Sequence, residues 1–351
     1  MKTIIEKITG DEEKDSSVIS QAAEIIRKGG LVAFPTETVY GLGGDAFMEE
    51  AAAKIYAAKG RPSDNPLIVH ISKPSDLNRL SDSIPANAWK LAERFWPGPL
   101  TIIVRKNDRV PMSVTGGLST VAVRCPSHGT AARLIEESGT FIAAPSANLS
   151  GRPSPTTAEH VIEDLSGRVD MIIDEGAIEI GLESTIVDVT EDMPVILRPG
   201  FITKEMLDEV LGEVKLDKAL MTGVKDGVKP KAPGMKYRHY APKAELYIVE
   251  GNKSDVVGAM QKLLEEGIRA GRKIGIMTTS EDCTEFKGGY VISLGSGNNY
   301  NEIAANLFAS LRKFDDLGVD VIYSEAFSEE GIGQAVMNRL LKAAGHKIIQ
   351  V

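Results

Sequence analysis

Short apolar runs that are typical of strands fill the first two hundred residues, and they constrain the fold more than any other feature of this chain. Helical spacing of apolar residues recurs between them, for example after Ser16 and Ser17, which we expect to cap a helix that ends at Gly29. The expected strands are residues 31–34, 67–71, 100–104, 120–124, 141–144, 171–174, 184–189 and 195–197. Because strands outnumber helices, the pattern favours a twisted mixed sheet with flanking helices over a simple doubly wound fold.

The pattern changes after about residue 211. Lys, Gly and Pro accumulate over 212–243, which we expect to be a linker. Beyond it, strands and helices alternate regularly, as in a small, parallel, Rossmann-like α/β domain. The expected strands there are residues 245–249, 273–277, 290–293 and 319–324, and the expected helices are 254–266, 300–314 and 332–344. The sequence therefore predicts domains at 1–211 and 244–351 with the linker between them.

Composition excludes several classes of protein. The chain has 351 residues, a formal net charge of -9 and no block of consecutive Lys or Arg, so we expect no strong direct binding of nucleic acid. Its two cysteines, Cys125 and Cys283, cannot build a disulfide framework or a cysteine-based zinc site. The N-terminus becomes acidic at residues 11–15, and no apolar run approaches the ~18 residues of a membrane span. We therefore expect a cytoplasmic protein.

Four loops that we expect at strand ends carry polar groups. In open α/β sheets, ligands bind in crevices beyond strand ends. Several polar loops at such positions are therefore stronger evidence for a ligand site than any one of them alone. Lys59 and Arg61 supply the positive charge that a triphosphate needs, while Ser146 and Asn148 supply neutral hydrogen-bonding groups. The loops are Thr36–Tyr40, Lys59–Asn65, Arg124 and Ser146–Asn148. The residues alone thus predict a nucleotide or phosphate site.

Each of these residues also has an ordinary structural interpretation. A cation pair in a turn is often a solvated surface feature, and His70, at the end of an apolar strand, is equally well explained as a structural histidine. Glu37 and Asp45 could bind Mg²⁺ through water or could simply stabilise turns. The segment 41–46 matches G-x-G-x-x-A, but Pro-Thr-Glu separates it from its strand, and no Walker loop or Gly-x-Ser-x-Gly sequence is present.

Seven short motifs, which occur in order and at plausible spacing, indicate a resemblance to a known family. The chain closely resembles the YrdC/Sua5 family of threonylcarbamoyl-AMP synthases over about residues 16–205. The linker sequence from Pro233 to Tyr240 and the extra α/β domain resemble the longer, Sua5-type branch. The motifs are Pro35–Leu42, Lys59–Arg61, Asn65–Leu67, Trp96–Thr101, Val123–Pro126, Ala144–Asn148 and Ser184–Asp188.

The resemblance implies a YrdC-like catalytic domain that makes L-threonylcarbamoyladenylate from ATP, L-threonine and bicarbonate or CO₂, with release of pyrophosphate. The product then goes to the transferase machinery that forms threonylcarbamoyladenosine at position 37 of tRNA. Mg²⁺ is expected to bridge ATP phosphate oxygens. By motif, Lys59, Arg61, Ser146 and Asn148 are expected to be catalytic and to hold nucleotide together with Asn65, Arg198 and Tyr240. Threonine is expected to contact Thr36, Tyr40, His70, Arg124 and Ser184, and Tyr237, His239 and Tyr240 are expected to form a lid.

Other interpretations stay open from the sequence. Hydrogenase-maturation proteins contain a similar domain and perform related carbamoyl-adenylate chemistry, but they carry Cys-rich zinc segments. A concave cationic surface could instead hold RNA, although the acidic net charge opposes it. The linker could be a passive tether. The C-terminal domain could bind a small regulator of its own near Gly331 and Gly333, where helix packing is the simpler explanation.

Overall fold

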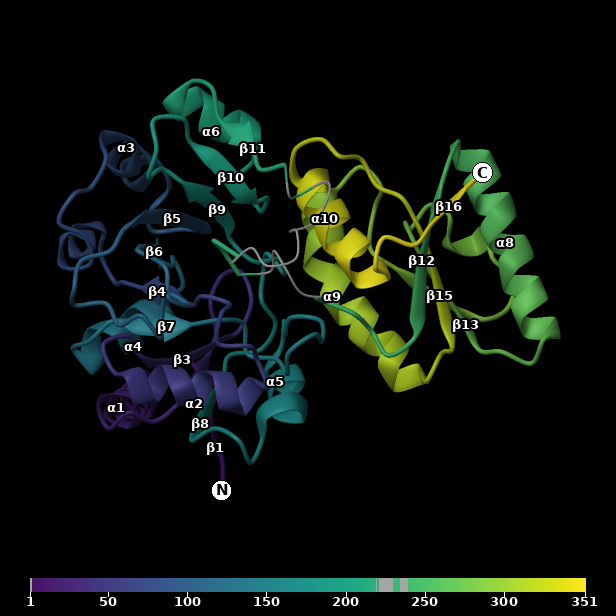
Figure 1. Cartoon of the computed structure of the whole chain (residues 1–351). Coiled ribbons are helices and arrows are strands. Elements are labelled where there is room, and N and C mark those ends of the chain that lie inside the picture. The colour runs from purple at the N-terminus through teal and green to yellow at the C-terminus, as the bar shows by residue number, and fades with distance from the viewer. Residues whose placement is uncertain (1, 219, 221–229, 234–238) are drawn as a thin grey trace. The chain divides into compact units, whose positions relative to one another are not determined.

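The structure is a computed structural model that describes residues 2–218, 220, 230–233 and 239–351 (Figure 1). The chain divides into two compact units. Unit 1 comprises Met1–Ser150, Ser154–Glu179 and Glu183–Lys236. Unit 2 comprises Gly151–Pro153, Ile180–Leu182 and Tyr237–Val351.

The described part of unit 1 is built on a mixed sheet of eleven strands in the order β1-β8-β2-β3-β7-β4-β6-β5-β9-β10-β11. Parallel and antiparallel neighbours alternate irregularly along it, as in the parallel pair β4–β6 and the antiparallel pair β5–β6. The strands are β1 Ile4–Lys7, β2 Val32–Phe34, β3 Gly41–Asp45, β4 Ile68–His70, β5 Leu100–Arg105, β6 Thr120–Arg124, β7 Ile142–Ala144, β8 Met171–Asp174, β9 Thr185–Asp188, β10 Val195–Arg198 and β11 Lys215–Leu216. The expected mixed sheet is confirmed.

Helices cover both faces of this sheet. Adjacent strand residues point to opposite faces, so apolar residues along one strand pack against different helices. Val32 and Phe34 of β2 join one apolar cluster with α1 and α4, while Ala33 joins a second, larger cluster that includes α2 and α3. The helices are α1 Glu12–Arg27, α2 Glu49–Lys59, α3 Ala86–Phe95, α4 Gly129–Ser138, α5 Ala158–Leu165 and α6 Lys204–Leu211, with a 3₁₀ helix, η1, at Pro74–Arg79.

Two local predictions in unit 1 are wrong. Helix α1 begins four residues before Ser16, because the Asp11 side chain caps it by accepting the Lys14 N–H at 3.2 Å. The glycine-rich segment Gly41–Asp45, which is absent from the expected strands, forms the buried strand β3. A Cβ on Gly43 would lie 2.5 Å from Ile142 Cγ2, so glycine at this position lets the Ile142 side chain pack against the backbone of β3. Glycine has a low strand propensity, so the sequence pattern does not predict this strand.

Unit 2 contains a fully parallel five-stranded sheet in the order β14-β13-β15-β12-β16. Figure 1 shows α8 on one face and α9 and α10 on the other. The elements are β12 Glu245–Glu250, α8 Lys253–Arg269, β13 Ile274–Thr278, η2 Cys283–Glu285, β14 Tyr290–Ser293, α9 Tyr300–Leu317, β15 Val321–Glu325, α10 Ile332–Ala344 and β16 Ile348–Gln350. This confirms the expected Rossmann-like α/β fold and adds the edge strand β16. Among the residues that the structure describes, no helix in either unit has the length and apolar character needed to cross a membrane.

Candidate active site

The Lys-x-Arg and Ser-x-Asn motifs, which are far apart in the sequence, meet in unit 1. Lys59 ends helix α2 and is only 2% exposed. Its Nζ donates hydrogen bonds to the main-chain oxygens of Ser146 and Asn148 and lies 3.4 Å from Asn148 Oδ1. The Ser150 N–H donates to Lys59 O at 2.9 Å, and Ser146 Oγ donates to Asn148 Oδ1 at 2.5 Å. The two motifs therefore form one hydrogen-bonded cluster.

Gly60 turns the chain from α2 toward Arg61. Its φ of 61° lies in the left-handed region that glycine adopts without steric cost, and a Cβ there would meet no atom within 4 Å. Arg61 is 8% exposed and donates to Pro66 O at 3.1 Å and to Asn65 O at 3.3 Å and 3.4 Å. Asn65 is also buried, and its Oδ1 has no hydrogen-bond partner among the described residues. The solvated-surface interpretation of this turn is wrong, since both cations are buried.

Arg124 occupies the end of β6, where it makes a buried ion pair that the sequence analysis did not identify. Its Nη2 lies 2.8 Å from Glu37 Oε2, and its Nη1 donates to Thr38 Oγ1 at 2.8 Å. Burial alone would raise the pKa of Glu37. The positive charge of Arg124 and the hydrogen bonds that the carboxylate accepts, including one from the Ser127 N–H, together outweigh burial and lower that pKa below its ordinary value. Arg124 Nε has no hydrogen-bond partner among the described residues. The guanidinium thus keeps a donor for a further anionic or polar group.

The loop from Thr36 to Tyr40 is held by its own hydroxyls. Thr36 Oγ1 donates to Val39 O at 2.6 Å, which closes a tight turn. The Tyr40 hydroxyl donates to Gly176 O at 2.8 Å and accepts the Glu175 N–H at 3.1 Å, and burial raises its pKa. The Ala147 N–H donates to Tyr40 O at 2.8 Å. The threonine-rich loop therefore lies directly against the Ser-x-Asn loop.

Strand register places His70 beside Arg124. The two residues are paired across β4 and β6, and His70 Nδ1 donates to Ile68 O at 3.1 Å. Complete burial, and then the nearby charge of Arg124, lower the pKa of His70 to about 3. His70 is therefore neutral at physiological pH, and its ring is held in place at an edge-on contact with Phe34.

Ser184 and Arg198 form a second polar cluster on the neighbouring strands. Arg198 donates from Nη2 to Ser184 Oγ at 3.1 Å and from Nε to Ser184 O at 3.0 Å. Ser184 Oγ is also 2.8 Å from Thr101 Oγ1, and Thr101 is paired with Arg124 across β5 and β6. Thr101 thus joins this cluster to Arg124. Its position in the Pro-Leu-Thr motif was the only sequence signal.

The remaining predicted residues are Asp45, Tyr237, His239 and Tyr240. Asp45 stabilises a turn by accepting hydrogen bonds from the Phe47 N–H at 2.8 Å and from Thr140 Oγ1 at 3.0 Å. His239 and Tyr240 belong to unit 2, where the Tyr240 ring stacks on Phe308 at 5.0 Å between centroids. Tyr237 lies outside the described residues.

Comparison with known proteins gives the family. A family model described as "Telomere recombination", which covers Sua5, YciO and YrdC proteins, matches residues 24–200, and a model described as "Threonylcarbamoyl-AMP synthase, C-terminal domain" matches residues 202–345. The chain belongs to the YrdC/Sua5 family. The second match places it in the Sua5-type branch, so both parts of the resemblance seen in the sequence are confirmed.

Relatives of the Sua5 type match almost the whole chain. A threonylcarbamoyl-AMP synthase from Pyrococcus abyssi is 51% identical over 94% of this chain and 95% of its own length. One from Bacillus subtilis is 49% identical over 98% of this chain and 97% of its own length. A crystal structure of P. abyssi Sua5 complexed with L-threonine superimposes with a TM-score of 0.93 at 48% identity and covers 100% of both chains.

Proposed function

We infer that this protein is an L-threonylcarbamoyladenylate synthase. It makes the adenylate from ATP, L-threonine and bicarbonate or CO₂ and releases pyrophosphate, and its product serves the threonylcarbamoyl modification of adenosine 37 in tRNA. The names of the full-length relatives support this activity. The observation within the structure that supports it most is the buried Arg124, whose guanidinium donates to the Thr38 hydroxyl and retains an unpaired Nε among the described residues. Such a group suits the carboxylate of an amino acid substrate.

We propose that Lys59 and Arg61, together with Ser146 and Asn148, hold the ATP phosphates and the α-phosphorus. Main-chain carbonyls fix both cations before any nucleotide arrives, so little reorganisation is needed when charge develops on the phosphoryl oxygens. Asn65 Oδ1 is an unpaired acceptor beside this cluster. It and Arg198 are proposed to contact the nucleotide.

The threonine is proposed to lie toward Arg124, where its carboxylate pairs with the guanidinium. Thr36, Tyr40, His70 and Ser184 would then surround its amine and hydroxyl. Because His70 is neutral, it places no positive charge beside the amine that must react. The amine captures CO₂ and gives up a proton to form a carbamate. A carbamate oxygen then attacks the α-phosphorus, and the bond from that phosphorus to the pyrophosphate leaving group breaks.

Mg²⁺ is proposed to arrive bound to ATP. Among the described residues, no group of three or more His, Cys, Asp or Glu side chains could hold a metal ion, and the Glu37 carboxylate is already paired with Arg124. Mg²⁺ commonly binds through substrate phosphates and water, and there it would neutralise phosphate charge. Chelation by EDTA is therefore expected to stop turnover without unfolding the protein.

The decisive experiment measures pyrophosphate release from Mg·ATP with L-threonine and bicarbonate each present or omitted, and separates the nucleotides by chromatography. We expect release that requires threonine, with a new adenylate that decays to AMP. Lys59→Ala is expected to abolish it, while Lys54→Ala, an exposed change on the same helix, is expected to leave it intact. Release that is indifferent to threonine would contradict the proposal.

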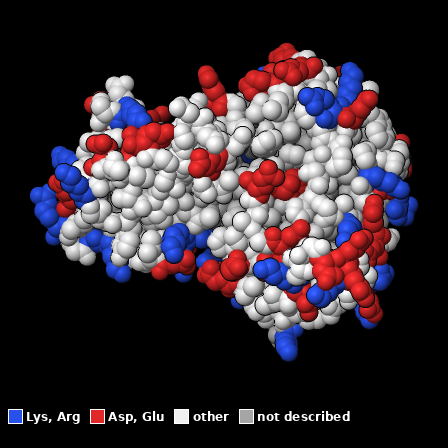
Figure 2. Space-filling view, turned by 180° about the vertical axis from the view of Figure 1, so that it is seen from behind, with Lys and Arg blue, Asp and Glu red and all other residues white. Residues whose placement is uncertain are grey.

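The later fate of the product is also part of the proposal. A mixed anhydride of this kind hydrolyses readily, so we propose that it is passed to the tRNA threonylcarbamoyl transferase machinery soon after it forms. We propose the cytoplasm as the place of this transfer. Acidic and basic side chains are interspersed on the face shown in Figure 2. The formal net charge of -9 argues against strong binding of tRNA by the enzyme itself.

A further inference from the structure

Unit 2 contains two adjoining cavities at the carboxyl ends of its parallel strands. After β13 the chain continues to β14, the strand at one edge of the sheet. After β15 it continues to β16, the strand at the other edge. Strands β13 and β15 are neighbours, and the segments that follow them run toward opposite edges of the sheet. A crevice therefore opens between the carboxyl ends of these two strands. Crevices at such positions are where open α/β sheets bind ligands. The two cavities measure about 220 Å³ and about 230 Å³.

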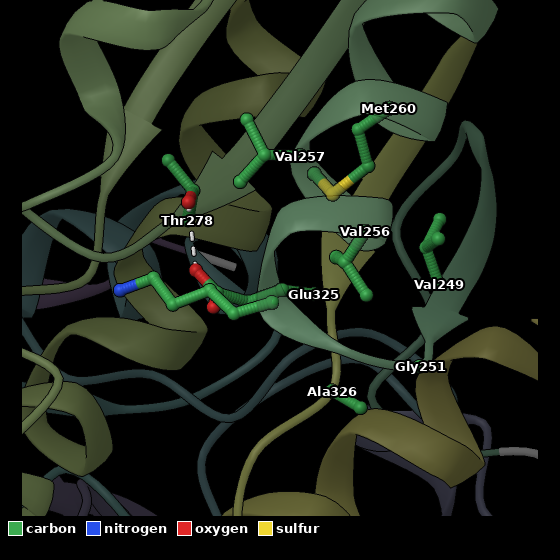
Figure 3. A pocket seen from close by; sticks show the side chains of 9 residues that line it. Val249, Gly251, Val256, Val257, Met260, Thr278, Glu325 and Ala326 are labelled. Carbon is green, nitrogen blue, oxygen red and sulfur yellow. Dashed lines mark hydrogen bonds between the residues drawn. The ribbon is translucent and has the colours of Figure 1, made fainter. Parts of the chain in front are cut away.

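The first cavity has one apolar side and one polar side, as Figure 3 shows. Val249, Val256, Val257 and Met260 form the apolar side. Thr278 and Glu325 face them from the ends of β13 and β15. Its volume suits a small branched aliphatic group, and a cavity lined in this way favours a ligand with an apolar body and a single polar end.

Glu325 is fixed in place as a hydrogen-bond acceptor. Its Oε1 accepts hydrogen bonds from Thr278 Oγ1 and from the Thr279 N–H, both at 2.7 Å. No described residue donates to Oε2, so that oxygen is available to a ligand. Glu325 lines both cavities, and therefore one carboxylate serves the whole crevice.

The charges around the crevice select against anions. Lys253 also lines both cavities, but its Nζ lies 3.2 Å from Asp282 Oδ2 and is partly neutralised there. Glu281 lines the second cavity and accepts hydrogen bonds from Ser296 Oγ at 2.6 Å and from the Gly297 N–H at 3.0 Å. Glu325 and Glu281 thus line the crevice with two carboxylates, and the single ammonium group there, that of Lys253, is paired with a third carboxylate, Asp282. A phosphate would be repelled, whereas a ligand ammonium would be attracted.

We propose that this crevice binds a small amphipathic ammonium compound. Its ammonium contacts Glu325, and its aliphatic body lies against Val256, Val257 and Met260. An aliphatic amino acid is the zwitterionic form of such a ligand, and its carboxylate would contact Lys253. This site lies wholly within unit 2 and goes beyond the proposed adenylate synthesis. Gly331 and Gly333 line neither cavity.

The test is isothermal titration of the full chain with three probes, and variants at Glu325 and Val257 assign the binding to this crevice and not to the substrate site. Isopentylamine and L-leucine carry the ammonium group, and isocaproate has the same aliphatic body with a carboxylate alone. We expect the first two to bind with one site per chain and isocaproate not to bind. Binding of isocaproate as tight as that of isopentylamine, or no binding of either ammonium probe, would overturn the proposal.

Variants locate the site. Glu325→Gln keeps the hydrogen-bond acceptor but removes the charge, so it is expected to weaken isopentylamine binding by about 10- to 100-fold. Val257→Phe fills the apolar side from α8 and is expected to have a comparable effect. Glu266→Gln, an exposed change on α8 that lines neither cavity, is the matched control. Unchanged affinity in both Glu325→Gln and Val257→Phe would refute this site.

Discussion

At the scale of single residues, this protein buries charges that look like surface groups in the sequence. The side chains of Glu37 and Arg124 are almost fully inaccessible to solvent, and they form an ion pair. They are far apart in the sequence, so only the folded structure brings them together. Removing one member of a buried ion pair leaves an uncompensated charge, which costs far more than losing a surface ion pair. The stability of the site therefore depends on Glu37, even though the reaction has no obvious need for it.

Glu37→Gln is expected to lower the free energy of unfolding by about 3 kcal/mol, because Arg124 loses its counter-charge. Urea unfolding at neutral pH measures this change. Glu136→Gln, an exposed substitution on α4, is the control and is expected to change the stability by less than about 0.5 kcal/mol. Equal effects of the two substitutions would show that the buried pair contributes nothing to stability.

His70 predicts a dependence of stability on pH. Its folded-state pKa of about 3 is lower than the ordinary 6.5, so below pH 6.5 the unfolded chain takes up a proton that the folded protein excludes. Stability is therefore full above pH 6.5 and falls as the pH drops toward 3. Between pH 6.5 and pH 5 the loss is expected to reach about 2 kcal/mol. Unfolding of His70→Asn over the same range should lack this loss, and an identical pH profile would contradict the assignment.

At the scale of elements, the strand β3 determines where the polar loop before it lies. All five residues of β3 are buried, and it pairs with β2 on one side and β7 on the other. Its glycines let Phe34 and Ile142 approach the backbone closely. The loop from Thr36 to Tyr40 connects β2 to β3, so the packing of these glycines positions the loop that carries Glu37.

Gly43→Ala is expected to destabilise the protein by about 1–3 kcal/mol, because the added methyl group would lie 2.5 Å from Ile142 Cγ2 and 2.8 Å from the Phe34 ring. Thermal unfolding measures the loss. Gly129→Ala, whose Cβ would meet no atom within 4 Å, is the matched control and is expected to be neutral or slightly stabilising. A neutral Gly43→Ala would mean that β3 has room that the structure does not show.

At the scale of the whole molecule, the end of the linker is anchored within unit 2. Tyr240 is 4% exposed, stacks on Phe308 and has Arg339 Cζ 5.9 Å from its ring centroid. Its φ of 65° is unusual for a residue with a side chain, so surrounding contacts must hold it there. The lid proposed from the family resemblance would therefore have a fixed end at Tyr240.

Tyr240→Ala is expected to increase the share of adenylate that hydrolyses to AMP, because a loosened lid admits water to a labile product. The ratio of AMP to intact adenylate, measured during turnover with threonine and bicarbonate, reports this directly. Tyr247→Ala, a change on β12 of the same unit, is the control. If both variants give the wild-type ratio, the segment is a passive tether.

Much of the secondary structure of this protein, and its family, could be predicted from local sequence patterns. Apolar periodicity predicts most strands and all three long helices of unit 2, because burial of one face is a property of each element by itself. The motifs around Lys59, Arg124 and Ser146 predict the family for a similar reason, since each is short and continuous. Helix α10 has the predicted bounds, Ile332–Ala344.

Local sequence patterns therefore predict most of the elements, the fold class and the family. The folded chain is needed to show that Glu37 pairs with Arg124, that Thr101 lies between Arg124 and Ser184, and that the glycine-rich segment is a strand. The physical reason is that these features depend on strand order and register. Arg124 and Thr38 are 86 residues apart in the chain, and their contact exists only because the sheet brings their strand ends together.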